Sequence, residues 1–185
     1  DARLQAFPML PFSMQSDPPS EGRFTRRMED SSRSATTGRF LVRTENWDLG
    51  TESTASKNCA YLRFSYPRGG AVRVLLDAQD AAPAHWLKDS RQAKVVAADS
   101  SIVDGVFEGS VTAEIDGKAE TVWAKIAFSP KPVAVREMAA NGRVGKRYVL
   151  EFALPVTVGD IQSKAAISGS SAAEAAERFA ADGDK

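Results

Sequence analysis

The stretch Glu52–Pro67, with the sequence ESTASKNCAYLRFSYP, decides the fold class of this chain. In its second half every other side chain falls on the same side of an extended backbone, and one of the two sides is apolar. The apolar set consists of Leu62, Phe64 and Tyr66, and the opposite set consists of Tyr61, Arg63 and Ser65. This alternation predicts a β-strand with one face in a hydrophobic core.

Similar strand patterns occur along most of the remaining chain. The runs SIVDGVFEGSVTAEI (residues 101–115) and KAETVWAKIAF (residues 118–128) flank Asp116-Gly117, a dipeptide typical of a two-residue hairpin turn. Further strands are predicted at about residues 39–44, 60–66, 71–76, 132–138, 146–154 and 160–168. Many short strands joined by turns predict an all-β fold, an antiparallel β-sandwich.

Only the C-terminal segment changes its period. The run SSAAEAAERFAADGDK (residues 170–185) has Ser171 at a capping position and Glu174 three residues on, which is the pattern of a capping box. Its alanines favour a helix, and Gly183 suits the end of one. Because a short helix with a thin apolar face buries little surface, we expect a linker. The sequence thus predicts a sandwich over residues 1–169 and a linker helix over residues 170–185.

The composition argues against several function classes. Basic and acidic residues number 24 each, so the net charge is zero, whereas nucleic-acid grooves and membrane surfaces favour a basic excess; we expect neither partner. The 185 residues include one Cys, Cys59, and one His, His85, which are too few for an internal disulfide or a His-rich zinc site. Nucleophile-elbow, phosphate-loop and dinucleotide motifs are absent. We therefore expect no catalytic and no metal-binding residue in this chain.

The opening stretch also resembles a strand pair of glycoside hydrolase family 92, the calcium-dependent exo-acting α-mannosidases. The family pattern is Glu-Leu-Thr-Ala-Thr-x-Arg-x-Gly-x-His-Arg-Tyr-x-Phe-Pro, and five positions are identical here: Glu52, Thr54, Ala55, Arg63 and Pro67. The segments AVRVLLD, AKIAFSPKP and KAAISGSSAAEAAERF resemble later parts of the family's domain in the same order. Two positions depart from the pattern, since Asn58 stands where the family has Arg and Leu62 where it has His.

The resemblance implies an N-terminal β-sandwich of the supersandwich, galactose-mutarotase-like type, with its opening segment missing. It implies that this sandwich docks on a helical catalytic domain, an α/α barrel, and helps to form a pocket for a mannose-containing glycan. The family inverts the anomeric centre, which requires two separated carboxyl groups. The resemblance places those groups and the calcium in the catalytic domain, so the chain alone is expected to be inactive. It also implies a secreted or periplasmic location.

Three residues are candidates for contact with a sugar. Arg63 lies opposite the predicted core face, where it either pairs with a carboxylate such as Glu52 or reaches a domain interface. Trp86 follows His85 in a loose connection, and Trp47 follows a strand. Each indole has an apolar face on which a pyranose ring could stack, or else it fixes a loop to the sandwich.

Two other function classes stay open. A stand-alone carbohydrate-binding module would show aromatic side chains in a row on an exposed sheet face, whereas a purely structural sandwich would bind no ligand. A broad apolar face beside the C-terminal helix would instead favour docking on another domain. Trp123, which alternates with Val122 and Ala124, is expected to cover the outer sheet face or to pack against that domain.

Overall fold

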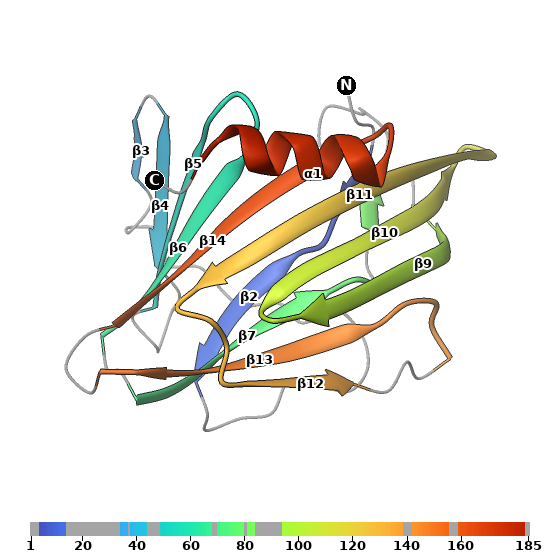
Figure 1. Ribbon diagram of the computed structural model, residues 1–185. Coiled ribbons are helices and arrows are strands. Elements are labelled where there is room, and N and C mark those ends of the chain that lie inside the picture. Colours follow the sequence, from blue (N-terminus) through green and yellow to red (C-terminus); the bar gives the residue numbers. More distant parts are fainter. Residues whose placement is uncertain are drawn as a thin grey trace.

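The structure is a computed structural model that describes residues 4–13, 34–36, 38–43, 49–67, 70–79, 81–83, 94–138, 142–155 and 159–183. Within these ranges, two antiparallel sheets face each other, and a helix lies on the outside of the larger sheet (Figure 1). The all-β sandwich predicted from the sequence is thereby confirmed.

The larger sheet has eight strands, and the last strand of the chain lies in its interior. Neighbouring strands pair antiparallel throughout. Their spatial order is β3 (Ser34–Thr36), β4 (Arg39–Arg43), β5 (Gly50–Ala55), β6 (Ala60–Tyr66), β14 (Gly159–Ser168), β11 (Lys118–Ser129), β10 (Val106–Ile115) and β9 (Lys94–Val103). The opening stretch supplies β5 and β6, so it lies next to the C-terminal strand β14.

The smaller sheet has four strands and covers one face of the larger sheet. Its order is β12 (Ala134–Met138), β13 (Arg147–Leu154), β7 (Gly70–Asp77) and β2 (Met9–Ser13). A separate short pair joins β1 (Leu4–Ala6) to β8 (Ala81–Pro83). Strand β2 lies at an edge and contains Pro11, which suits an edge position because proline cannot donate to a ladder.

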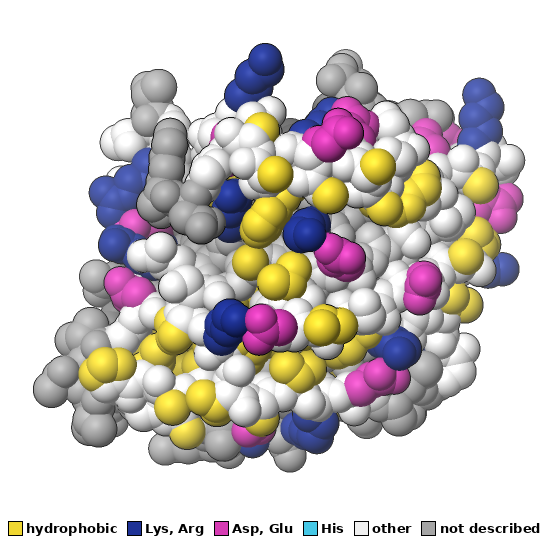
Figure 2. Space-filling model, viewed as in Figure 1, with side chains coloured by type: hydrophobic (Ala, Val, Ile, Leu, Met, Phe, Trp, Pro, Cys, Tyr) yellow, Lys and Arg dark blue, Asp and Glu magenta, His cyan; other side chains and the backbone are white. Residues whose placement is uncertain are grey.

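Helix α1 (Ala172–Ala181) packs on the outer face of β14 and β11, and charged and hydrophobic side chains are interleaved around it (Figure 2). The Ser171 side chain accepts a hydrogen bond of 3.1 Å from the Glu174 amide, as the capping pattern predicts. The Glu174 carboxylate in turn accepts a 2.5 Å bond from the Ser168 hydroxyl at the end of β14. This bond holds the pKa of Glu174 below its usual value. The cap therefore ties the helix to the sheet.

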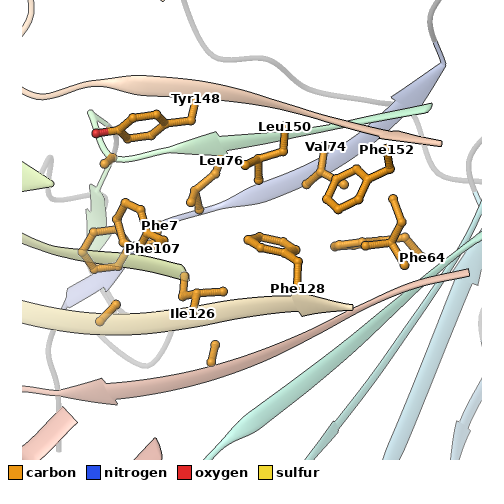
Figure 3. Packing of buried hydrophobic residues seen from close by; sticks show 14 of the residues in the cluster. Phe7, Phe64, Val74, Leu76, Phe107, Ile126, Phe128, Tyr148, Leu150 and Phe152 are labelled. Carbon is orange, nitrogen blue, oxygen red and sulfur yellow. The ribbon is translucent and has the colours of Figure 1, made fainter. Parts of the chain in front are cut away.

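The hydrophobic core lies between the two sheets, where inward side chains of both interdigitate (Figure 3). The larger sheet contributes Phe64, Phe107, Ile126 and Phe128, and the smaller sheet Val74, Leu76, Tyr148, Leu150 and Phe152. On β11 the even-numbered residues from 122 to 128 are all buried and form one face toward the core, as the alternation of side chains along a strand requires. Burial of this contiguous apolar surface is the main stabilising term of the fold.

One strand boundary predicted from the sequence was wrong. Residues 101–115 do not form one strand, because a second tight turn at Asp104-Gly105 ends β9 and starts β10. Asp104 and Gly105 have φ values of 51° and 78°, close to the 53° and 71° of Asp116 and Gly117. Both Asp-Gly pairs therefore occupy the left-handed region that two-residue hairpins require.

Candidate functional site

The opening stretch provides most of the wall of a cavity of about 520 Å³ beside β4, β5, β6 and β14. We call it the Arg63 cavity. Its lining consists of Arg39, residues 52–56, residues 61–63, Gln162 and Ser163. Its volume lies within the range of small-molecule sites, which is about 300 to 1,000 Å³.

An ion-pair network lies at this cavity. Strand register places Arg63 opposite Glu52 on one side and Gln162 on the other. The Arg63 guanidinium contacts the Glu52 carboxylate at 2.7 Å, and Arg39 donates to the second oxygen of the same carboxylate. Arg39 and then Arg63 hold the pKa of Glu52 below its usual value, against an opposing effect of partial burial. The pairing of Arg63 with Glu52 that the sequence suggested is thus confirmed.

Two buried polar atoms at the cavity have no hydrogen-bond partner among the described residues: Arg63 Nε and Ser163 Oγ. Ser163 is 2% exposed. Buried polar atoms in proteins are almost always paired with protein or water. Strand register pairs Arg63 with Gln162 and Ser163 with Leu62, so the two side chains lie on opposite faces of the sheet. Only Arg63 Nε lies on the face of the ion-pair network, where it could donate to the hydroxyl group of a ligand.

The end of helix α1 is fixed beside the same cavity by Asp182. One carboxylate oxygen accepts from the Tyr61 hydroxyl at 3.0 Å and from Ser56, and the other accepts from the Asn58 amide at 3.2 Å. Because Tyr61 is partly buried and bonded to this anion, its pKa is raised to about 12. Asn58, a departure from the family pattern, therefore helps to hold the end of helix α1. Leu62, the other departure, packs against the core.

The buried carboxylate Asp77 belongs to a structural network and not to this cavity. Arg147 Nε donates to Asp77 Oδ2 at 2.7 Å, and both side chains are almost fully buried. The backbone N–H of Gln79 donates to the other Asp77 oxygen at 2.8 Å. The side-chain amide of Gln79 donates to the Gly145 carbonyl at 3.0 Å. These bonds join β7 to β13 and the loop before β13.

Tryptophan, which the sequence suggested as a possible sugar contact, is absent from the described residues that line the Arg63 cavity. Trp47, Trp86 and His85 lie outside the described residues. Trp123 lies on the outer face of the larger sheet, partly exposed beside α1. Asp182, Gln162 and Ser163 were missed by sequence reasoning, because no local pattern marks them. The strand order places Gln162 opposite Arg63 and Ser163 opposite Leu62, and the position of the helix brings Asp182 to Tyr61.

No metal centre is formed by the described part of the chain, where no group of three or more His, Cys, Asp or Glu side chains could hold an ion. No calcium ligand is therefore assigned here. A search of the same residues finds no helix with the length and apolar character of a membrane span.

Exposed large apolar side chains occur at several places in the described residues. They lie on four different strands and in two connections: Phe40, Val96, Val103, Val133, Val135, Val144 and Ile167. They do not by themselves mark one broad docking face beside α1.

Comparison with solved structures shows the same fold in larger enzymes. The family GH92 α-mannosidase BT3965 of Bacteroides thetaiotaomicron is similar over 97% of this chain, with a TM-score of 0.78 and 16% identity. The GH92 inverting mannosidase BT2199 of Bacteroides thetaiotaomicron VPI-5482 is similar over 97%, with a TM-score of 0.73 and 16% identity. The GH92 family glycosyl hydrolase ccman5 is similar over 88%, with a TM-score of 0.63 and 16% identity.

This chain spans about a quarter of the length of these enzymes: 26% of BT3965, 24% of BT2199 and 23% of ccman5. No curated protein sequence matches the chain. The family model for the glycosyl hydrolase family 92 N-terminal domain matches residues 2–184, nearly the whole sequence. The chain therefore belongs to glycosyl hydrolase family 92, as its N-terminal domain.

Proposed function

We propose that this domain is the accessory part of an α-mannosidase and that the Arg63 cavity forms one wall of its glycan pocket. The observation that carries the proposal is the bonding of Arg63, which pairs with Glu52 at 2.7 Å while its Nε has no partner among the described residues. Membership of the family and the names of the similar enzymes, two of which are called mannosidases, support the choice of sugar.

The chemistry of the cavity suits a neutral sugar. Glu52 neutralises part of the charge of Arg39 and Arg63, so a charged ligand is not required. A guanidinium presents several donors in one plane, and the ion pair fixes that plane before a ligand arrives. A pre-oriented donor loses less entropy on binding, which favours affinity.

The hydrolytic groups belong, in this proposal, to a catalytic domain of the same protein. Inverting hydrolysis needs an acid and a base on opposite sides of the sugar, and the described cavity holds one carboxylate, Glu52, already paired with two arginines. Calcium would likewise be bound by the catalytic domain. Asp182 fixes the end of α1 next to Tyr61 and Ser56, which line the cavity, and this supports docking on that side.

Trp47 and Trp86 stay proposed sugar contacts, and a secreted or periplasmic location stays part of the proposal. The test is hydrolysis of an aryl α-mannoside by the full-length protein that contains this chain and by the chain of 185 residues alone. We expect turnover by the full-length protein and none by the chain alone. Turnover by the chain alone would contradict the accessory role, and an inactive full-length protein would contradict the mannosidase assignment.

A further inference from the structure

A second cavity, of about 340 Å³, lies on the outer face of the larger sheet beside helix α1. We call it the α1 groove. The side chains on its sheet side come from two neighbouring cross-strand rows: Asp99, Ser110 and Trp123, and Ser101, Glu108 and Lys125. Ala172 and Ala176 of α1 form its other wall. It shares no lining residue with the Arg63 cavity.

The sheet side of the groove combines an aromatic surface with hydrogen-bonding groups. The partly exposed Trp123 indole lies across the ladder from Ser110, and Ser110 lies across from Asp99. A pyranose ring has an apolar C–H face that packs on an indole, while its hydroxyl groups bond to carboxylates and serine hydroxyls. This is the set of groups that recognition of a sugar ring needs.

The charges of the groove favour a neutral ligand over an anionic one. Lys125 contacts Glu108 at 2.7 Å, so these two charges compensate each other. The remaining charged group of the lining is the Asp99 carboxylate, which accepts hydrogen bonds from hydroxyls but repels anions. A neutral sugar therefore suits the groove better than a phosphorylated or carboxylated one.

The helix side leaves the space open because its residues are small. Ala172 and Ala176 are one turn apart and line the groove, whereas the larger Phe179 packs further along the helix, with Lys164 and Lys125 over its ring. A larger side chain at position 176 would extend into the groove.

We propose that the α1 groove binds one neutral pyranose ring of a glycan, with the ring stacked on Trp123 and its hydroxyl groups bonded to Asp99 and the neighbouring serines. The groove would give this domain a sugar contact of its own, in addition to the wall formed by the Arg63 cavity. Only the choice of an α-mannoside as the probe rests on the proposed function.

The test is an NMR titration of the 185-residue chain with methyl α-D-mannopyranoside. The sugar is added up to about 50 mM, which saturates a site with a millimolar Kd. We expect saturable shifts of the Trp123 indole N–H signal and of the Ser101 and Ser110 amides, with the indole signal assigned from Trp123→Phe. Trp123→Ala should weaken binding about tenfold, since it removes the stacking surface.

A matched pair of helix variants separates groove binding from a general effect on folding. Ala176→Leu fills the groove and should abolish the shifts, whereas Ala173→Leu makes the same change at an exposed position outside the lining and should retain them. Retained binding in Ala176→Leu, absence of saturable shifts in the unaltered chain, or equal shifts with glycerol would overturn the proposal. Because this readout is binding at Trp123, it can fail independently of the hydrolysis that tests the proposed function.

Discussion

The Tyr61 hydroxyl on β6 donates a 3.0 Å hydrogen bond to the Asp182 carboxylate at the end of helix α1. The two residues are 121 positions apart in the sequence. Ser56 and Asn58, from the β5–β6 turn, donate to the same carboxylate. Asp182 thus links the end of helix α1 to the turn beside the Arg63 cavity.

Replacement of Asp182 with Asn should loosen this link. The variant loses the negative charge and one acceptor oxygen, so we expect the free energy of unfolding to fall by about 1 to 2 kcal/mol. The Tyr61 pKa should fall below about 12 but stay raised, because burial, the larger cause, remains and only the effect of the anion is lost. Tyrosinate absorbance during a pH titration measures the pKa. Glu177→Gln, which neutralises an exposed acid of the same helix, is the control and should leave the Tyr61 pKa unchanged.

The raised pKa of Tyr61 also predicts a pH dependence of stability. A group whose pKa is higher in the folded than in the unfolded state stabilises the fold fully below its unfolded pKa, about 10 for tyrosine. That contribution is lost as the pH rises through about 12. Urea unfolding across this window should therefore show a steeper loss of stability for the unaltered chain than for Tyr61→Phe. Equal slopes would show that folding does not raise the pKa of Tyr61.

Glu52 should affect stability at the acid end of the pH range. Its pKa lies below the ordinary 4.5 in the folded state, so its contribution is present above that pH and disappears as the pH falls through the folded pKa. At neutral pH, Glu52→Gln should lower the free energy of unfolding by about 1 kcal/mol, because Arg39 and Arg63 are both partly exposed. The difference in the free energy of unfolding between Glu52→Gln and the unaltered chain should disappear at a pH below the folded pKa of Glu52. A difference that persists there would mean that packing, not charge, is responsible.

The buried pair of Asp77 and Arg147 should show strong coupling. Asp77→Ala removes the carboxylate that pairs with the buried Arg147 guanidinium and should cost about 3 to 5 kcal/mol. The double variant Asp77→Leu with Arg147→Met removes both charges and should cost less than the single variant. Urea denaturation of the three proteins measures the difference. A double variant that is less stable than Asp77→Ala would refute this interpretation of the pair.

Two glycines with positive φ should differ in their tolerance of alanine. A Cβ added at Gly145, where φ is 95°, would lie 2.5 Å from the Ala78 carbonyl oxygen and 2.9 Å from the Ala98 side chain. A Cβ at Gly117, where φ is 71°, would meet nothing within 4 Å. Both substitutions cost about 1 kcal/mol of backbone strain, and Gly145→Ala adds a steric clash. The midpoint temperature of thermal unfolding should be clearly lower for Gly145→Ala than for Gly117→Ala. Equal midpoints would contradict the tight packing at Gly145.

The sequence predicted those features that depend on local patterns. Alternation located β6 and β11, an Asp-Gly pair located the β10–β11 hairpin, and the capping residues located α1. The second Asp-Gly turn, at Asp104-Gly105, was missed because the residues on both sides continue the strand pattern. The ion pair of Arg63 with Glu52 could be predicted from the sequence, because a hairpin makes their two strands neighbours.

The rest of the site depends on the order of the strands in the sheet. The strand β14 inserts between β6 and β11, and this insertion places Gln162 opposite Arg63 and Ser163 opposite Leu62. The position of α1 across β14 and β11 then brings Asp182 to Tyr61 and creates the groove at Trp123. Neither arrangement follows from any local segment, so composition and spacing could not predict them.

The most direct test of the central claim, that the Arg63 cavity forms part of a glycan pocket, is the kcat/KM of the full-length protein on an aryl α-mannoside. Arg63→Ala should lower kcat/KM by at least about tenfold, mainly through KM, because a pre-oriented donor to the sugar is lost. Arg73→Ala removes a comparable strand ion pair, to Glu151 at 3.1 Å in the smaller sheet, and should leave kcat/KM within about twofold. An Arg63→Ala enzyme as active as the Arg73→Ala enzyme would contradict the account.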